Sequence, residues 1–291
     1  MSVTPTLVPV GERSVTVPFD IGDARFGEGY FTVIAGPCAV ESREQAMACA
    51  IGVDAAGATM FRGGAYKPRT SRHSFQGLGP AGLALLAEVK AHTGLPIVTE
   101  LLDVRDLELV VRVADVVQIG ARNMYNTPLL REVGRCRKPV LLKRGLSATL
   151  DEFLHAADYV LGEGNERVIL CERGIRTFEQ AYRFTLDLAA VSVLKTRSQL
   201  PVIVDPSHAA GHAALVRPLA LAATAAGADG LMIEAHHAPE IARCDSDQAV
   251  AIDRLPELVE AAAAIARLGG KTVTTRAGDD CLLPERRRAR L

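Results

Sequence analysis

Apolar runs recur along the chain, and each one ends in a polar or charged residue. Eight of them have the length and composition of buried β-strands: Phe31–Ala35, Ala58–Phe61, Pro96–Thr99, Val116–Ile119, Pro139–Leu142, Val168–Cys171, Pro201–Val204 and Gly230–Ile233. Stretches with apolar residues at three- and four-residue spacing lie between them and predict helices: Glu44–Ala56, Gly82–Thr93, Val104–Arg112, Thr127–Val133, Thr149–Gly162, Thr177–Lys195, Ala213–Ala226 and Leu255–Leu268. Continuous apolar strands that alternate with helices are typical of a parallel sheet covered on both faces. Eight such units in about 240 residues predict an α/β fold, a single (β/α)8 TIM barrel.

The segments outside the barrel are short. Ser14–Phe19 and the stretch around Ala24–Phe26, with Ile21-Gly22-Asp23 between them, predict an N-terminal hairpin that plugs the bottom of the barrel. Residues 1–12 are expected to be poorly ordered, and the C-terminal tail, with its run Arg286–Arg288, is expected to be solvated. We therefore expect an N-terminal extension over 1–30, a catalytic barrel over 31–268 and a tail over 269–291.

Composition narrows the functional classes. The 291 residues carry a formal net charge of -1, which argues against a nucleic-acid coat or a membrane-surface protein. The sequence has no apolar run as long as a membrane-spanning helix and no basic-then-apolar signal pattern, so a cytoplasmic location is expected. Six scattered cysteines without CxxC pairing indicate free thiols. Cys49 and Cys171 are expected to pack as small hydrophobes, whereas Cys38 follows a strand end.

Positive residues gather after the predicted strands and in the Tyr66–Gly79 segment, which has the composition of a substrate loop. They are Arg62, Lys67, Arg69, Arg122, Lys143, Arg144 and Arg173. The carboxyl ends of barrel strands meet at one face, so we expect all seven side chains in one mouth. Such a cluster in a nearly neutral protein predicts an anionic ligand with more than one phosphate or carboxylate.

A second set of strand-end residues has the chemistry of metal ligands. Cys38, His208, Glu234 and Asp245 follow the first, seventh and eighth strands, which adjoin in a closed barrel. One thiolate, one imidazole and two carboxylates suit Mn²⁺, Fe²⁺, Co²⁺ or Zn²⁺ rather than Mg²⁺ or Ca²⁺. Alternative ligands are His212, His236, His237 and Asp247. Four other polar residues lie at strand ends: Glu100, Gln118, Glu172 and Asp205. One interpretation is that they orient cations, hold a water molecule or exchange protons. The other is that they form structural pairs with the neighbouring arginines.

Six motifs in order carry a resemblance to a known family. They are Ile34-Ala35-Gly36-Pro37-Cys38-Ala39-Val40-Glu41-Ser42, Lys67-Pro68-Arg69-Thr70-Ser71, Gln118-Ile119-Gly120-Ala121-Arg122-Asn123, Leu142-Lys143-Arg144-Gly145, Cys171-Glu172-Arg173-Gly174-Ile175-Arg176-Thr177 and Asp205-Pro206-Ser207-His208. Over about residues 14–265 the chain resembles the type I-beta 3-deoxy-D-arabino-heptulosonate 7-phosphate (DAHP) synthases. The related 3-deoxy-D-manno-octulosonate 8-phosphate (KDO8P) synthases usually carry an inserted Asn near Lys67–Thr70, so the resemblance favours a four-carbon acceptor over a five-carbon one.

The resemblance implies a reaction and a residue for each role in it. Phosphoenolpyruvate would be held by Arg62, Lys67, Arg122, Lys143 and Arg173, with Glu100 and Gln118 at the same site. Erythrose 4-phosphate would lie against Arg69 and Thr70. A divalent ion (Mn²⁺, Co²⁺, Fe²⁺ or Zn²⁺) on Cys38, His208, Glu234 and Asp245 would polarise the aldehyde in an aldol-type condensation. The residues expected to take part in the chemistry are Lys143, Cys38, His208 and Asp205. Family members form homo-oligomers, so a dimer or tetramer is expected.

Several positions depart from the family pattern and leave alternatives open. Tyr125 and Thr127 replace common Gln and Phe, Ala235-His236-His237 replaces Val-His-Pro, and Cys244 replaces a Ser beside Asp245. These changes leave open a paralogue in specialised metabolism. Rival readings are a Schiff-base aldolase that uses Lys143 as its nucleophile and a non-catalytic phosphosugar sensor. About 30 residues precede the first barrel strand, so no fused feedback domain is expected.

Overall fold

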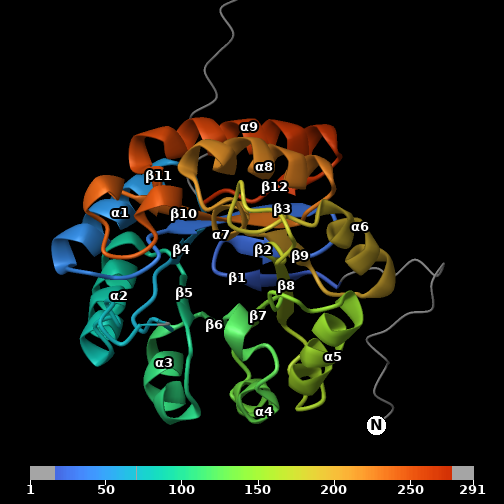
Figure 1. The fold of residues 1–291 in the computed structure, drawn as a ribbon, viewed down its shortest axis with the longest axis horizontal. Coiled ribbons are helices and arrows are strands. Elements are labelled where there is room, and N and C mark those ends of the chain that lie inside the picture. The colour runs from blue at the N-terminus through green and yellow to red at the C-terminus, as the bar shows by residue number, and fades with distance from the viewer. Residues whose placement is uncertain (1–16, 70, 277–291) are drawn as a thin grey trace, which may run out of the picture.

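The computed structural model describes residues 17–69 and 71–276. Within them, eight parallel strands form a closed barrel at the centre of the fold (Figure 1). Each strand pairs with the next along the chain and the last returns to the first, in the order β3 (Tyr30–Gly36), β4 (Met60–Arg62), β5 (Ile97–Glu100), β6 (Val116–Ile119), β7 (Val140–Lys143), β8 (Val168–Glu172), β9 (Val202–Val204) and β10 (Gly230–His236). Two short strands extend the sheet, β11 (Val250–Ala251) beside β10 and β12 (Thr272–Val273) beside β3. The predicted TIM barrel is confirmed.

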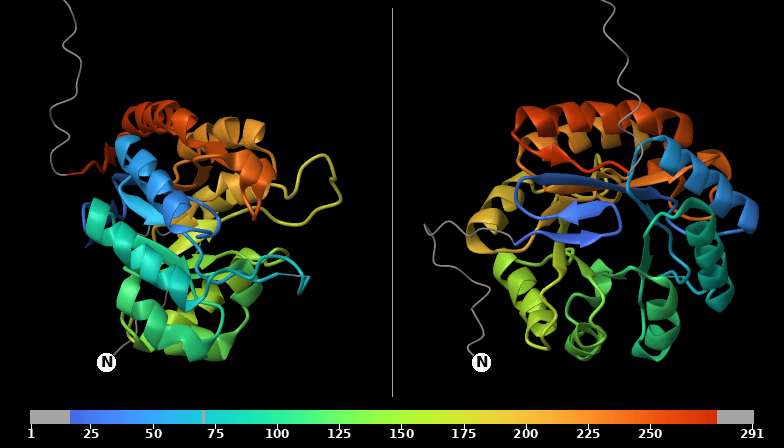
Figure 2. Two further views of the ribbon diagram at one scale, coloured as in Figure 1. Left: turned by 90° about the vertical axis from the view of Figure 1, so that its left-hand side faces the viewer. Right: turned by 180° about the vertical axis from the view of Figure 1, so that it is seen from behind.

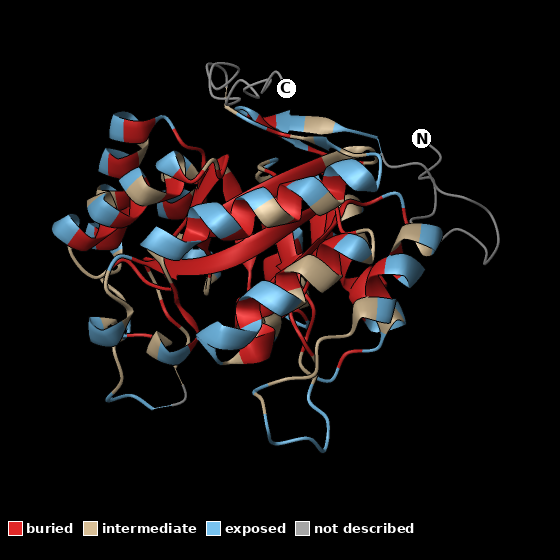
Figure 3. Cartoon of the chain, turned by 90° about the horizontal axis from the view of Figure 1, so that it is seen from above, coloured by how far each residue is buried: buried red, intermediate tan, exposed pale blue. Residues whose placement is uncertain are grey.

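Helices surround the barrel, with their buried faces toward the strands and their exposed faces outward (Figure 3). They are α1 (Arg43–Ala55), α2 (Pro80–Thr93), α3 (Leu107–Val113), α4 (Thr127–Arg135), α5 (Leu150–Leu161), α6 (Leu188–Arg197), α7 (Pro206–Ala210), α8 (Ala213–Ala225) and α9 (Leu255–Leu268). Short 3-10 turns lie between them: η1 (Val104–Asp106), η2 (Ala121–Asn123), η3 (Pro239–Ile241), η4 (Ser246–Gln248) and η5 (Ile252–Arg254). Polar caps fix several helix starts. Ser42 accepts the Gln45 N–H before α1, and Thr149 forms a reciprocal capping box with Glu152 before α5.

An antiparallel hairpin, β1 (Phe19–Ile21) and β2 (Ala24–Phe26), closes one end of the barrel. Its apolar side chains share a buried cluster with residues that the barrel strands contribute, among them Ile34, Met60, Val98, Val116, Leu141, Ile169, Ile203 and Met232. The predicted plug is therefore present, although the predicted strand Ser14–Phe19 and turn at Ile21 were misplaced. Gly22 takes the turn with a φ of 58°, which lets β1 run on to Ile21. Residues 14–16 lie outside the described part of the chain.

One predicted helix was wrong over much of its length. Helix Thr177–Lys195 was expected, but residues 173–187 form a long loop and α6 begins only at Leu188. An antiparallel bridge between Ile175 and Thr185 pins the base of this loop, and the Asp187 carboxylate caps α6 by accepting the Ala190 N–H. The predicted helix Val104–Arg112 is also divided, into η1 and α3.

The two long loops mark the other end of the barrel. Figure 2 (left) shows the loop after β4, in cyan, and the loop after β8, in yellow, projecting from one side, away from the hairpin. At this end Gly36 leads from β3 toward Cys38 with a φ of 145°. A Cβ at that position would lie 2.1 Å from the Arg62 carbonyl oxygen, so the turn requires glycine. Glu234 on β10 pairs in register with Gly36, which brings the first and last barrel strands' functional residues together.

Expectations for the chain ends fall largely outside the described residues. Residues 1–12 and the run Arg286–Arg288 belong to this undescribed part, as does Cys281. The remaining cysteines, all within the described part, are free thiols as expected. No helix in the described part is long and apolar enough to cross a membrane.

Candidate active site

A pocket lies at the carboxyl ends of the barrel strands, and positive side chains dominate its wall. The sequence-predicted residues that line it are Arg62, Lys67, Arg69, Glu100, Gln118, Arg122, Lys143, Arg173, His208 and Asp245. Thr70, the other predicted substrate residue, lies outside the described residues. The pocket thus brings six of the seven predicted cations to one mouth.

Arg144 is the cation that does not face the pocket, contrary to the prediction. Its guanidinium is buried and donates to the Glu172 and Asp187 carboxylates, each at 2.9 Å, and to the Ala148 carbonyl at 3.0 Å. Glu172 also accepts the Gly174 N–H at 2.7 Å. The two residues therefore form a structural pair under the loop after β8, which is the structural alternative considered for Glu172.

Arg183 lines the pocket in place of Arg144, and sequence reasoning missed it. The loop of residues 173–187 brings it there, and its Nη1 donates to Gln248 at 2.7 Å and contacts Asp245 at 3.4 Å. Phe184 stands beside it, with the Arg173 guanidinium 4.3 Å from the centre of its ring. The erroneous helix prediction hid both residues. A loop prediction for this segment would have made Arg183 a candidate.

Arg173 is a buried cation with no carboxylate ion pair among the described residues. Its side chain donates to the His208 carbonyl at 3.3 Å, and burial lowers its pKa to about 10. Burying a charge is costly unless an opposite charge accompanies it. An anionic ligand in the pocket would supply that charge.

Cys38, His208, Glu234 and Asp245 converge at the base of the pocket. Each offers one ligand atom, and these four atoms lie within 4.8 Å of one another. The Cys38 Sγ is 3.0 Å from Asp245 Oδ2 and 4.0 Å from His208 Nε2, and His208 Nε2 is 3.6 Å from Glu234 Oε2. One sulfur, one nitrogen and two oxygens at this spacing could hold a borderline divalent ion.

The surroundings of Glu234 fit a carboxylate that ligates a metal ion. Its side chain is almost fully buried and its Oε1 has no hydrogen-bond partner within the described part of the molecule. Burial raises its pKa well above the usual value, and the nearby Cys38 and Asp245 add to the shift. Its other oxygen accepts from Gln248 Nε2 at 2.7 Å, a contact that sequence reasoning did not find because it joins η4 to β10.

Asp205 anchors both His208 and Lys143 from below. The carboxylate is fully buried, lies 2.7 Å from His208 Nδ1, accepts the His208 N–H at 2.9 Å and forms an ion pair with the Lys143 ammonium. Burial alone would raise its pKa, but the neighbouring His208 and Lys143 outweigh it and hold the pKa well below its usual range. The carboxylate at Nδ1 leaves His208 Nε2 facing the ligand cluster.

Lys67 and Cys244 surround the Cys38 thiol. Lys67 Nζ donates to Cys38 Sγ at 2.9 Å, and Cys244 Sγ lies 3.5 Å from Cys38 Sγ. The hydrogen bond that the Cys38 thiol shares with Cys244, together with burial, raises the pKa of Cys38 to about 12. Arg69 Nη1 in turn donates to Cys244 Sγ at 2.9 Å. Cys244, noted as a departure from the family pattern, therefore connects the pocket wall with the ligand cluster.

The remaining alternatives and departures lie elsewhere. His212 and Asp247 are exposed, and His236 and His237 gather around Cys49 rather than around Cys38. Tyr125 is exposed and its hydroxyl lies 3.4 Å from Glu152 Oε2, while Thr127 is the first residue of α4. Neither residue is among those that line the pocket.

Comparison with known proteins identifies the family. The model of the DAHP synthetase I family matches residues 9–267, and the chain belongs to this family. A Thermotoga maritima protein named phospho-2-dehydro-3-deoxyheptonate aldolase is 51% identical over 241 residues, which cover 83% of this chain and 71% of that protein. A crystal structure of the Thermotoga maritima protein of that name (DAHP synthase) has a TM-score of 0.86 at 49% identity, covering 89% of this chain and 76% of that one. A Geobacter sulfurreducens 2-dehydro-3-deoxyphosphooctonate aldolase is 31% identical, covering 86% of this chain and 98% of that protein.

Proposed function

We propose that this member of the DAHP synthetase I family joins phosphoenolpyruvate to erythrose 4-phosphate and releases phosphate. The product is 3-deoxy-D-arabino-heptulosonate 7-phosphate, the first intermediate of the shikimate pathway to aromatic amino acids. The observation that carries the proposal is the cation-lined pocket directly beside the Cys38, His208, Glu234 and Asp245 cluster. The name of the Thermotoga maritima relative, which is 51% identical to this chain, supports it.

Phosphoenolpyruvate would occupy the inner part of the pocket. Its phosphate and carboxylate match the buried or pocket-lining cations Arg62, Lys67, Arg122, Lys143 and Arg173. Arginine binds such groups with two parallel hydrogen bonds, whereas lysine contributes a point charge. Glu100 and Gln118, at paired positions on β5 and β6, would orient these cations and hold water.

Erythrose 4-phosphate would enter beside Arg69 and Thr70, with its phosphate on the arginine. Two phosphates and one carboxylate bring about four to five negative charges into one pocket at neutral pH. The pocket offers Arg183 in addition to the six predicted cations. The positive charge of the pocket offsets the negative charge of the reactants, so two reactants of like charge can approach each other.

A divalent ion, Mn²⁺, Co²⁺, Fe²⁺ or Zn²⁺, would be held by Cys38, His208, Glu234 and Asp245. Glu234 Oε1, which has no hydrogen-bond partner among the described residues, and the mixed sulfur, nitrogen and oxygen donors fit such an ion. When bound, it would supply Lewis-acid polarisation of the aldehyde oxygen. Asp205 would keep His208 in the orientation that presents Nε2, because its carboxylate lies against Nδ1.

The condensation forms one carbon–carbon bond and, by addition of water at C2, one carbon–oxygen bond, and it breaks the carbon–oxygen bond to the phosphate. C3 of phosphoenolpyruvate attacks the aldehyde carbon, positive charge develops at C2, and water adds there. Cleavage of the bond between C2 and the bridging oxygen then releases phosphate. Lys143 Nζ, held by Asp205, is the group we assign to donate a proton or stabilise charge beside these atoms.

The geometry of Lys143 argues against the Schiff-base alternative. A nucleophilic amine must be neutral, whereas this amine forms a buried ion pair with the Asp205 carboxylate. We expect borohydride in the presence of a ketone substrate to leave the mass of the protein unchanged. A trapped adduct at Lys143 would support the alternative.

A five-carbon acceptor is the second candidate, because octulosonate-forming relatives also match the chain at 31% and 30% identity. The sequence Lys67-Pro68-Arg69-Thr70, without an inserted Asn, favours the four-carbon sugar. A paralogue acting on another phosphorylated aldose in specialised metabolism is tested by the same assay.

The test is phosphate release from phosphoenolpyruvate with erythrose 4-phosphate, arabinose 5-phosphate or ribose 5-phosphate as acceptor. We expect the highest kcat/KM with erythrose 4-phosphate. The matched control is Arg69→Lys, which keeps the charge but loses paired hydrogen bonds, and should raise the KM for the sugar phosphate while leaving the KM for phosphoenolpyruvate near the wild-type value. A preference for arabinose 5-phosphate would refute the acceptor assignment.

We also propose a homo-oligomer, a dimer or tetramer. Phe178, in the loop after β8, is 94% exposed, which is unusual for so large an apolar side chain and fits a contact between subunits. Light scattering of the purified chain should give a mass at least twice that of the monomer. A monomeric mass would contradict this expectation.

A further inference from the structure

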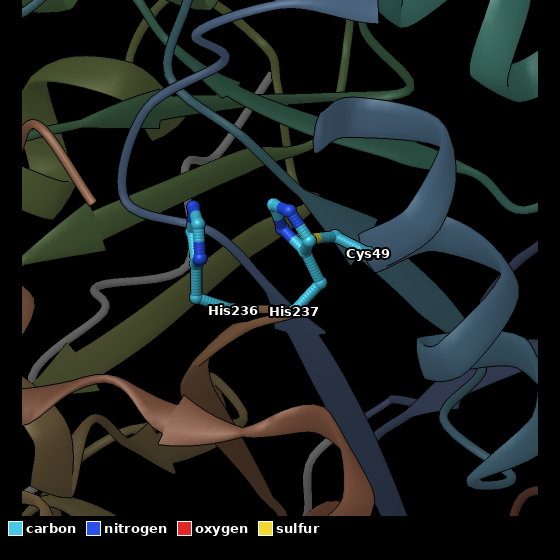
Figure 4. A group of neighbouring side chains, drawn as sticks. All are labelled: Cys49, His236 and His237. Carbon is cyan, nitrogen blue, oxygen red and sulfur yellow. The ribbon is translucent and has the colours of Figure 1, made fainter. Parts of the chain in front are cut away.

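A second group of metal-ligating side chains lies on the outer side of the β10 end. Cys49 comes from α1, His236 is the last residue of β10 and His237 follows it (Figure 4). The residues are far apart in sequence, but they meet because β10 closes the barrel against β3 and α1 packs over both strands. None of the three belongs to the proposed active site, which leaves their juxtaposition unexplained.

The ligand atoms of these residues stand at distances that suit one ion. All three atoms lie within 4.8 Å of one another, and Cys49 Sγ is 3.7 Å from His237 Nδ1. With zinc–sulfur bonds of about 2.3 Å and zinc–nitrogen bonds of about 2.0 Å, neighbouring ligand atoms of a tetrahedral site are roughly 3.5 Å apart. The two imidazole rings lie side by side, with centroids 4.7 Å apart and planes 33° from parallel.

His236 supplies an independent sign that a partner is missing at this position. Its side chain is 2% exposed and its Nε2 has no hydrogen-bond partner within the described residues. Buried polar atoms are nearly always satisfied, because each one left unpaired is costly. A simple hydrogen bond between the Cys49 thiol and His237 would explain their 3.7 Å contact but would leave His236 Nε2 unpaired.

We infer that Cys49, His236 and His237 form a second metal site, distinct from the Cys38 cluster, that binds a Zn²⁺-like ion. One thiolate and two imidazoles select zinc, cobalt or a similar borderline ion over Mg²⁺ and Ca²⁺. Cys49 is fully buried while His237 is exposed, so the ion would be reached from the surface and the fourth ligand would be water. On binding, the thiol of Cys49 gives its proton to solvent.

Binding also has a local structural consequence. His236 Nδ1 now accepts the Ala238 N–H at 3.1 Å, so the ring proton belongs on Nε2. Coordination through Nε2 moves that proton to Nδ1, which then cannot accept a hydrogen bond. The Ala238 amide must therefore turn away, and its hydrogen exchange should change when the ion binds.

The position of the site connects it with the proposed active site. Glu234 lies two residues before His236 on β10, and the segment after His237 leads to Asp245. The backbone N–H of Arg243 in that segment donates to Glu41, just before α1, at 2.9 Å. An ion that ties α1 to the start of this segment would restrain both Glu234 and Asp245.

The test is the number of zinc ions retained by the metal-stripped full chain after reloading and gel filtration. We expect two equivalents for the wild type, and one equivalent for Cys49→Ser and for His237→Gln. The second variant changes an exposed side chain, so a loss of fold would not explain its result. Cys136→Ser, which removes another cysteine from the end of α4, is the matched control and should keep two equivalents.

A cobalt experiment separates this site from the first. In a Cys38→Ala, His208→Asn background, Co²⁺ should still give a thiolate charge-transfer band, and adding His237→Gln should abolish it. A His237→Gln variant that retains as many equivalents as the wild type would overturn the inference. So would the absence of a cobalt–thiolate band in that background.

Discussion

Metal binding at the Cys38 cluster should release protons, and this predicts a pH dependence that can be measured without substrate. In the free protein the hydrogen bond that the Cys38 thiol shares with Cys244, together with burial, raises the pKa of this thiol to about 12. Glu234 is likewise buried, with a pKa well above its usual range. The metal binds the thiolate and the carboxylate, so every proton held by these groups must leave.

The magnitude follows from the pKa of Cys38. At pH 7 the thiol lies five units below a pKa of about 12, and at 1.36 kcal/mol per unit its deprotonation costs about 7 kcal/mol. The free protein therefore holds more protons than the metal-bound protein, so the affinity must rise as the pH rises. We expect about a tenfold gain per pH unit from Cys38 alone, and any proton that Glu234 releases on binding adds to this slope.

The assay is calorimetric titration of the metal-stripped chain with Zn²⁺ in buffers of different ionisation enthalpy, between about pH 6 and 8. Cys49→Ser serves as the background, because it removes the second proposed site. Cys38→Ser is the matched variant, and it should release about one proton fewer and bind more weakly. An affinity that stays flat across this range, or proton release that Cys38→Ser leaves unchanged, would refute the reasoning.

Two other substitutions test the support of the site and the closure of the barrel. Asp205→Asn removes the charge that holds His208 Nδ1 and Lys143, and should weaken zinc binding by about 10- to 100-fold in a competition assay with a chelator; unchanged affinity would show that Asp205 does not position His208. Phe26→Ala empties part of the buried cluster under the barrel and should lower the free energy of unfolding by about 3–5 kcal/mol in urea. Phe19→Ala, at the half-buried ring stacked on Phe26, should cost less, and equal losses would contradict the proposed plug.

The barrel was predictable because its strands carry a strong signal. Strands buried on both faces read as uninterrupted apolar runs, and eight of them in sequence leave few alternative folds. The same geometry predicts the site, because the residue that follows each barrel strand lies at the same end of the barrel. Arg62, Lys143 and Glu234 follow from position in this way, without knowledge of any long-range contact.

The errors have a different physical origin. Residues 177–187 have helical spacing, but the bridge from Ile175 to Thr185 and the cap at Asp187 fix a loop instead. These tertiary contacts do not appear in local periodicity. For the same reason the sequence placed Arg144 in the pocket and missed Arg183, since only packing decides which carboxylate each arginine reaches.

Cys49 illustrates a limit of reading residues one at a time. Its apolar neighbours in the sequence predict a small hydrophobe in the core, and it is indeed buried there. The contact that suggests a metal site is with His237, which is distant from Cys49 in the sequence. Closure of the barrel between β10 and β3 brings the two residues together. Only the three-dimensional arrangement pairs a buried thiol with two imidazoles.

The most direct test of the account is phosphate release by the metal-stripped chain, measured before and after a divalent ion is added back. We predict that phosphate appears only when phosphoenolpyruvate, erythrose 4-phosphate and a divalent ion are present together, and that Cys38→Ala stays inactive after the ion is added. Phosphate release at the wild-type rate by the stripped protein, or by Cys38→Ala, would contradict the claim that a metal cluster and a ring of cations join two phosphorylated reactants at this rim.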